Sequence, residues 1–214
     1  MYSADEIRKS MRLYAVTDRV CLKNYSLQSA VEEALLGGVS CIQLREKKAS
    51  NDDIELLARS IKPLCVQAHV PLIINDAVEV AVKIEADGVH IGQHDMSCSY
   101  ARSKMGPHAI IGVSVQTLDQ AMCAQTEGAD YLGVGAMFPT PTKPDAAEVS
   151  FEELRRICAS VSIPVVVIGG ISAQTIPLLA DTGIDGIAVV SAIFGADNIK
   201  EASESLLRNV NEIL

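Results

Sequence analysis

Short apolar runs alternate with longer amphipathic stretches along the whole chain, and this alternation is the feature that most constrains the fold. The apolar runs are rich in β-branched residues, which is typical of strands that are buried on both faces. They cover Arg12–Asp18, Cys41–Glu46, Pro71–Asp76, Gly88–Gly92, Ala109–Val115, Tyr131–Met137, Pro164–Gly170 and Gly186–Ile193. Strands that are separated by helices pair in parallel through right-handed crossovers. The pattern therefore predicts one parallel sheet of eight strands.

The stretches between the strands repeat apolar residues every three or four positions, which predicts helices. They include Ser26–Leu36, Asp52–Gln67, Ser99–Met105, Leu118–Glu127, Phe151–Ala159, Gln174–Asp181 and Asn198–Ile213. Eight strand–helix units in 214 residues match the count and size of a closed (β/α)8 barrel, the TIM barrel, and a doubly wound open sheet is the alternative.

The chain has no long linker of Pro, Gly or Ser, so we expect residues 1–214 to form a single domain. Residues 1–11 would be an N-terminal extension with a capping helix, because Ser3 and Glu6 have the spacing of a capping box. Three similar phrases place glycine where a helix ends and a strand follows, which we interpret as an architectural repeat. They are Gly37–Ile42, Glu127–Leu132 and Thr182–Ile187.

The composition supports a barrel and disfavours several other classes of protein. Hydrophobic residues make up 49% of the chain but aromatic residues only 4%, so the core must consist of Val, Ile, Leu and Ala, as in parallel sheets covered by helices. A net charge of −9 argues against a nucleic-acid partner, which requires an excess of Lys and Arg. The six cysteines lie far apart, and neither a signal peptide nor a membrane-spanning run is visible. We expect a cytoplasmic protein without a membrane partner, and a homo-oligomer is compatible with the sequence.

The stretch Gln43–Lys47 carries charge where the barrel should be apolar. A strand turns alternate residues to one face, so Gln43, Arg45 and Lys47 would point the same way. Burying two cations costs several kcal/mol unless an anion neutralises them. In an acidic protein, a phosphate group is the natural anion, and a solvent-exposed edge strand is the alternative interpretation.

Function in such barrels lies at the carboxyl ends of the strands, and polar residues collect at the ends of the other predicted strands as well. These residues are Asn75, Asp76, His90, Gln93, Asp95, Ser114, Thr140, Thr142, Lys143, Gly169, Gly170 and Ser191. The sequence therefore predicts one polar rim with several anion-binding groups. Residues 138–148, rich in Pro and Thr, are a candidate lid over it.

Asp76 and Asp95 follow neighbouring strands, so their carboxylates can share one cation. Beside Arg45, Lys47 and Lys143, this arrangement suits Mg2+ bound to a diphosphate. The alternative is that each Asp only caps the helix that follows it.

Zinc is a weaker alternative at the same rim. His90 and His94 are four residues apart, and Asp95 follows them. This spacing chelates a metal on a helix, whereas here it runs from a strand into a loop.

Gly169-Gly170, with Val190-Ser191 one strand later, has the position of the phosphate cradle that barrels form after strands seven and eight. Glycines let backbone N–H groups approach an anion, and a helix N-terminus favours negative charge. A pair of glycines also serves simply as a turn. The rim is thus predicted to hold a diphosphate and a monophosphate.

From Leu13 to Phe194 the sequence resembles the thiamine phosphate synthase family. The matching motifs are Gln43-Leu44-Arg45-Glu46-Lys47, Asn75-Asp76, Ala86–Asp95, Gly112-Val113-Ser114, Thr140-Pro141-Thr142-Lys143, Gly169-Gly170-Ile171 and Val190-Ser191. The resemblance implies a transferase that joins an aminopyrimidine (hydroxymethylpyrimidine) diphosphate to a thiazole phosphate and releases pyrophosphate, giving thiamine monophosphate.

The resemblance also implies roles for individual residues. Those implied to hold the pyrimidine diphosphate are Gln43, Arg45, Lys47, Asn75, Ser114 and Lys143, and all but Gln43 are the candidate catalytic residues. Asp76 and Asp95 would bind Mg2+. Those implied to hold the thiazole phosphate are Thr140, Thr142, Gly170, Val190 and Ser191, and the same motifs add Leu44, Glu46 and Pro141 to the expected substrate-binding set. The implied mechanism is dissociative, with no covalent enzyme intermediate.

Two other functions remain open at this point. A thiazole tautomerase has a similar fold but needs no diphosphate site, so the carboxylates and cations at the rim argue against it. A non-catalytic barrel that binds a phosphate-bearing ligand is the second, and the complete set of rim residues argues against that too.

Overall fold

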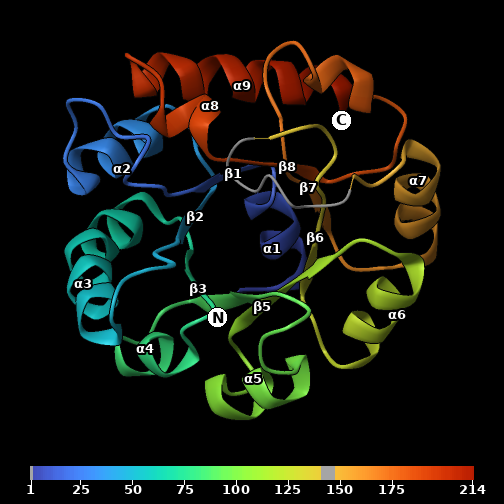
Figure 1. Cartoon of the computed structure of the whole chain (residues 1–214), viewed down its shortest axis with the longest axis horizontal. Helices are drawn as coiled ribbons and strands as arrows, with labels where there is room; N and C mark the ends of the chain where they lie inside the picture. Colours follow the sequence, from blue (N-terminus) through green and yellow to red (C-terminus); the bar gives the residue numbers. More distant parts are fainter. Residues whose placement is uncertain (1, 141–147) are drawn as a thin grey trace.

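The computed structural model describes residues 2–140 and 148–214. Eight parallel strands pair in sequence order, and β1 pairs with β8, so the sheet closes into a barrel (Figure 1). The strands are β1 Leu13–Val16, β2 Cys41–Leu44, β3 Leu72–Asn75, β4 Gly88–Ile91, β5 Ile110–Val115, β6 Tyr131–Val134, β7 Val165–Val167 and β8 Gly186–Val189. The predicted (β/α)8 barrel is confirmed, and closure excludes both the open sheet and the exposed edge strand. Each strand is shorter than predicted.

Helices surround the barrel, and most begin at a Ser, Thr or Asn whose side chain caps the first turn (Figure 1). They are α1 Ala4–Ser10, α2 Leu27–Leu36, α3 Asn51–Ala68, α4 Val78–Lys83, α5 Cys98–Met105, α6 Leu118–Thr126, α7 Phe151–Ser160, α8 Ser191–Phe194 and α9 Ile199–Ile213. Within residues 2–140 and 148–214, no helix has the length and apolarity needed to cross a bilayer.

The structure corrects one predicted helical stretch and adds a helix that was not predicted. The helix expected over Gln174–Asp181 is only a four-residue 3-10 turn, η1 (Ile176–Leu179), in which Pro177 lacks the N–H that a longer helix would use. Helix α4 was not predicted, because six residues of alternating Val, Glu, Ala and Lys are too few to establish a helical period.

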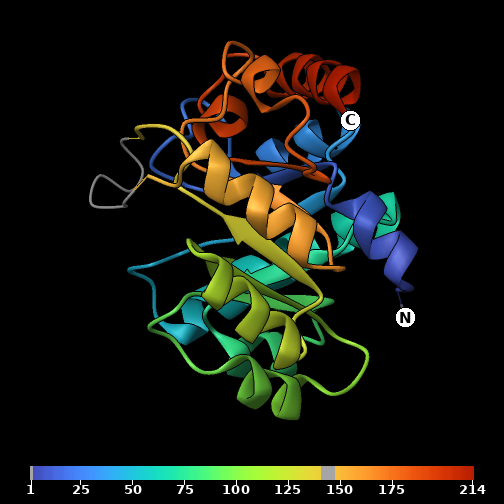
Figure 2. The same ribbon diagram turned by 90° about the vertical axis from the view of Figure 1, so that its right-hand side faces the viewer.

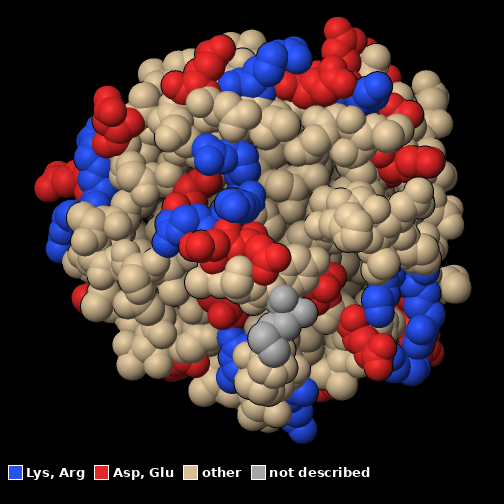
Figure 3. Space-filling model, turned by 180° about the vertical axis from the view of Figure 1, so that it is seen from behind, with Lys and Arg blue, Asp and Glu red and all other residues tan. Residues whose placement is uncertain are grey.

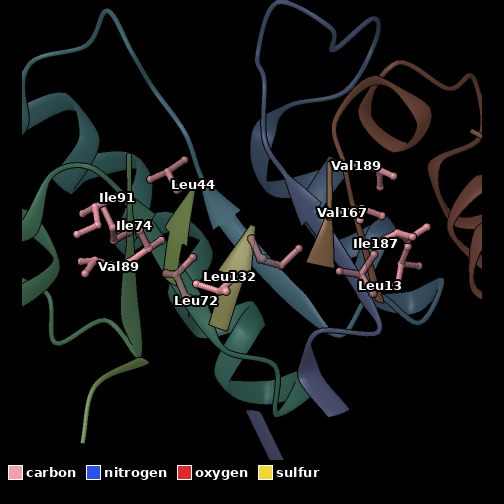
Figure 4. Close-up of a cluster of buried hydrophobic side chains, with 14 of the residues drawn as sticks. Leu13, Leu44, Leu72, Ile74, Val89, Ile91, Leu132, Val167, Ile187 and Val189 are labelled. Atoms are coloured by element: carbon pink, nitrogen blue, oxygen red, sulfur yellow. The ribbon is translucent and has the colours of Figure 1, made fainter. Parts of the chain in front are cut away.

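Alternate residues of each strand face two different cores. The outward side chains pack beneath the helices in one large cluster, of which Figure 4 labels ten, among them Leu13, Leu72 and Val167. The inward side chains form a smaller cluster that includes Tyr14, Ile73 and Val166. The strands therefore read as continuous apolar runs, because both of their faces are buried.

Helix α1 closes the amino-terminal end of the barrel (Figure 2). The predicted capping box is present: the Glu6 N–H donates to Ser3 Oγ at 3.3 Å, and the Ser3 N–H donates to Glu6 Oε2 at 2.8 Å. Ile7 and Met11 join the inner cluster and fill the barrel from below. Acidic and basic side chains gather near the centre of this face in Figure 3. The opposite end of the barrel is left for the site.

The glycine repeat has a structural counterpart at the amino-terminal ends of the strands. In each of four places, the residue just before an even-numbered strand accepts a hydrogen bond from a backbone N–H near the start of the preceding strand. The pairs are Leu13 N–H to Ser40 Oγ at 2.9 Å, Leu72 N–H to Asp87 Oδ2 at 2.9 Å, Ile111 N–H to Asp130 Oδ2 at 2.7 Å and Val165 N–H to Asp185 Oδ2 at 2.8 Å. The repeat therefore fastens neighbouring strands in pairs.

One position of this repeat departs from glycine. Gly38, Gly128 and Gly183 have left-handed φ angles of 89°, 94° and 83°, and Glu85 takes the same place with a φ of 53°. A residue with a Cβ atom is strained in this conformation, so Glu85 is a locally unfavourable choice. Because Glu85 conceals the glycine pattern, the fourth repeat was not recognised in the sequence.

Candidate active site

A cavity of about 570 Å³ opens at the carboxyl ends of the strands. Thirteen of the predicted site residues lie in the described part of the chain, and eleven of these line the cavity. They are Gln43, Arg45, Lys47, Asn75, Asp76, Asp95, Ser114, Thr140, Gly170, Val190 and Ser191. Residues that are far apart in the sequence, from Gln43 to Ser191, thus line one cavity.

Leu44 and Glu46 lie outside the cavity, so the expectation that they bind substrate is not supported. Leu44 is buried in the core beneath the helices, because it is an outward position of β2. The Glu46 carboxylate accepts hydrogen bonds from the Arg19 guanidinium at 2.8 and 3.1 Å. Pro141, Thr142 and Lys143 lie outside the described residues, as does most of the candidate lid.

The charged stretch that follows β2 reaches the cavity from a loop rather than from the strand itself. Strand β2 ends at Leu44, so only Gln43 occupies an inward strand position, where it is buried. The loop is held by the Arg45 N–H, which donates to Thr17 Oγ1 at 3.0 Å. Arg45 and Lys47 nevertheless line the cavity, as the alternation predicted.

Asp76 and Asp95 approach each other from the ends of β3 and β4. Burial, followed by the charge of Asp95 and a hydrogen bond with it, raises the pKa of Asp76 to about 6, while Lys47 acts in the opposite direction. Neither residue caps a helix: α4 begins after Ala77, which makes no side-chain cap, and Ser97 caps α5. The alternative of two helix caps is therefore wrong, and the structure contains a pair of facing carboxylates.

Local backbone geometry holds both carboxylates in place. Asp76 has a left-handed φ of 61°, and its N–H donates to the His90 carbonyl at 2.9 Å. Asp95 Oδ2 accepts from the Gly92 N–H at 2.8 Å, and a Cβ atom at Gly92 would lie 2.9 Å from this oxygen. Asp tolerates the left-handed region better than most residues, which makes Asp76 compatible with its position.

Two carboxylates that repel each other beside a cation-lined wall fit a divalent ion with oxygen ligands, such as Mg2+. Zinc fits less well. His90 is engaged on both ring nitrogens, with Tyr131 Oη at 2.9 Å from Nδ1 and Ser114 Oγ at 2.8 Å from Nε2. Among residues 2–140 and 148–214, no three His, Cys, Asp or Glu side chains form a metal-binding group.

The loop after β7 shows why glycine is needed at the expected phosphate cradle. Gly169 and Gly170 have φ angles of 96° and 66°, and a Cβ atom at Gly170 would lie 2.6 Å from Phe138 Cβ and 2.8 Å from the Pro139 carbonyl oxygen. Val190 and Ser191, at the start of α8, line the same cavity as Gly169 and Gly170. Glycine is required at position 170 because the loop packs closely against residues 138 and 139 of the same chain.

Sequence reasoning missed the floor of the cavity. Tyr14 and Tyr131 were not proposed as site residues, yet both are fully buried inside the barrel, and their hydroxyls lie 2.7 Å apart. His90 was noted at the polar rim and as a possible zinc ligand but not as a site residue, and Gln116 was not noted at all, although both line the cavity. The signal was available, because Tyr14 and Tyr131 are large side chains with a polar group at inward strand positions.

A closed parallel barrel with cations, paired carboxylates and a glycine-rich loop at the carboxyl ends of its strands defines a class of enzymes that act on phosphorylated substrates. Residues 13–193 match the family model described as thiamine monophosphate synthase. The chain therefore belongs to the thiamine monophosphate synthase family, whose members are transferases of thiamine biosynthesis.

Individual relatives agree with this membership. The chain is 49% identical to the thiamine-phosphate synthase of Alkaliphilus oremlandii over 92% of its own length and 95% of the relative's. It is 53% identical to that of Methanobrevibacter smithii, over 83% and 85% of the two chains. The solved structure of thiamine phosphate pyrophosphorylase from Pyrococcus furiosus matches with a TM-score of 0.88 and 40% identity, covering 97% of this chain and 98% of that one.

Proposed function

We propose that this chain is a thiamine-phosphate synthase that joins an aminopyrimidine diphosphate to a thiazole phosphate, giving thiamine monophosphate and pyrophosphate. The observation that carries the proposal is that Arg45, Lys47, Asp76 and Asp95 line one cavity, in a chain of this family. A thiazole tautomerase has no use for such a set, and the curated relatives described above are named as synthases.

The diphosphate would lie against Arg45, Lys47, Asn75 and Lys143, with the pyrimidine ring between Gln43 and Ser114. Asp76 and Asp95 would hold Mg2+, which would neutralise part of the charge that develops on the departing pyrophosphate. The facing carboxylates support this assignment, because burial and then the charge of Asp95 raise the pKa of Asp76 to about 6, and a divalent cation would favour the ionised form of both carboxylates. The thiazole phosphate would lie against Thr140, Thr142, Gly170, Val190 and Ser191.

The reaction proposed is dissociative. The bond between the methylene carbon and the bridging oxygen breaks first, and its electron pair leaves with pyrophosphate. The thiazole nitrogen then donates its lone pair to the methylene carbon, which forms the new C–N bond. The cations of the rim lower the barrier by stabilising the leaving group, at about tenfold in rate for each 1.4 kcal/mol. No side chain needs to act as a nucleophile.

The direct test is product formation. Purified protein is incubated with Mg2+ and both substrates, and thiamine monophosphate and pyrophosphate are measured by chromatography. Both products should appear in equal amounts, and each should be absent when either substrate is omitted. Folded protein that forms neither product would refute the assignment, and binding of both substrates without turnover would favour a non-catalytic barrel.

A further inference from the structure

A chain of hydrogen bonds crosses the floor of the cavity. Gln43 Nε2 donates to Tyr14 Oη at 2.7 Å, Tyr14 Oη lies 2.7 Å from Tyr131 Oη, and Tyr131 Oη lies 2.9 Å from His90 Nδ1. His90 Nε2 lies 2.8 Å from Ser114 Oγ. The two ends, Gln43 and Ser114, are expected substrate contacts, whereas the three middle residues have no role in the mechanism above.

Donor and acceptor capacity fixes the direction of this chain. Burial raises the pKa of both phenols well above the ordinary value, so each keeps its proton and can donate once. Tyr14 Oη accepts from Gln43, and its other neighbour, the Cys41 thiol, is a weak acceptor. Tyr14 therefore donates to Tyr131.

The direction then carries through to Ser114. Tyr131, which accepts from Tyr14, donates to His90 Nδ1. His90 must then carry its proton on Nε2 and donate it to Ser114 Oγ. The Ser114 hydroxyl, which accepts from His90, can therefore donate its own proton to a ligand in the cavity. Gln43, which donates through Nε2, can accept a hydrogen bond from the ligand through Oε1.

The barrel makes space for this network with two glycines inside strands. A Cβ atom at Gly112 of β5 would overlap the Tyr131 ring, and a Cβ atom at Gly133 of β6 would lie 3.1 Å from His90 Cε1. Glycine weakens a strand interior, so its use at both inward positions indicates that the rings need the room.

We propose that Tyr14, Tyr131 and His90 are positioning residues that hold the two ends of the network in one hydrogen-bonding polarity, with an acceptor at Gln43 and a donor at Ser114. This inference rests on the proposed function for the identity of the ligand. A 4-aminopyrimidine complements that polarity, because its exocyclic amine donates and its ring nitrogen accepts. A 4-oxopyrimidine carries an acceptor in place of the amine and is mismatched.

The first experiment reads the network in the protein without substrates, so its outcome does not depend on whether thiamine monophosphate is formed. Nitrogen-15 NMR of labelled wild-type protein should show His90 as the neutral Nε2–H tautomer, with its signals assigned by their loss in His90→Gln. In Tyr131→Phe the tautomer should become mixed, whereas Tyr100→Phe, at a 45% exposed tyrosine, should leave it unchanged. An Nδ1–H tautomer in the wild type would overturn the proposal.

The second experiment measures specificity. Tyr131→Phe should lower kcat/KM for the aminopyrimidine diphosphate by at least about tenfold and change KM for the thiazole phosphate by less than about twofold. Its preference for the amino over the oxo substrate should fall by at least about tenfold. Tyr14→Phe, which breaks the same chain one bond earlier, serves if Tyr131→Phe does not fold. Equal losses with both substrates, or an unchanged preference, would refute the positioning role.

Discussion

Replacing Asp76 with Asn should stabilise the metal-free protein while it removes activity. Burial and the nearby Asp95 raise the pKa of Asp76 from its ordinary value of 3.8 to about 6. This rise corresponds to about 3 kcal/mol of unfavourable free energy in the ionised state, at about 1.4 kcal/mol per pH unit. Because the side chain is only half-buried, solvent screening reduces the expected gain in the free energy of unfolding to about 1–2 kcal/mol. Asn is suitable because it tolerates the left-handed φ of 61°.

The sign of the pH dependence follows from the direction of the pKa change. The unfolded carboxyl ionises near its ordinary pKa of 3.8, and the folded one near a pKa of about 6, so the folded state binds more protons between these values. The penalty in the wild type is absent below about pH 4, develops as the pH rises and is complete above about pH 6. The advantage of Asp76→Asn should therefore be present at pH 7 and absent at pH 4.

The assay is urea unfolding in EDTA at both pH values, followed by circular dichroism. Asp181→Asn is the matched control, because Asp181 is exposed and also has a left-handed φ, of 58°. Mg2+ should then stabilise the wild type and not Asp76→Asn, which would reverse their order. Equal stability of the two proteins at pH 7, or a gain that persists at pH 4, would refute the electrostatic reasoning.

Three further outcomes are expected. Asp76→Ala and Lys143→Ala should each lower turnover at least about a hundredfold in steady-state assays, because each removes a charge that the proposed mechanism needs. Near-normal turnover in both variants would show that the reaction takes place elsewhere. Ser191→Ala should mainly raise the dissociation constant for the thiazole phosphate in calorimetry, and an unchanged constant would displace that subsite. Glu85→Gly should raise the free energy of unfolding by about 0.5–1 kcal/mol, because glycine adopts the left-handed φ of this position without strain. The control Glu79→Gly, in α4, should lower the free energy of unfolding by about 1 kcal/mol. A change of the same sign in both variants would contradict the strain argument.

The architecture could be predicted because it depends on periodicity. Alternating strand and helix patterns determine a parallel sheet, and the count of units determines its closure. The same alternation placed Gln43 on the inward face and Leu44 on the outward face, although the motif that contains both led us to expect substrate contact from each. Position along a strand was therefore a better guide to the site than membership of a motif.

What the sequence determined by itself is which residues stand at the carboxyl ends of the strands and which family the motifs match. The proximity of Asp76 and Asp95 was expected, because they follow neighbouring strands. Only the tertiary structure showed the path from Tyr14 through Tyr131 to His90, which joins β1 to β6 and β6 to β4, and these strands are not consecutive. Such contacts depend on the stagger of the strands in the closed barrel and on the space beside glycines of other strands. Neither feature can be predicted from a local stretch of sequence.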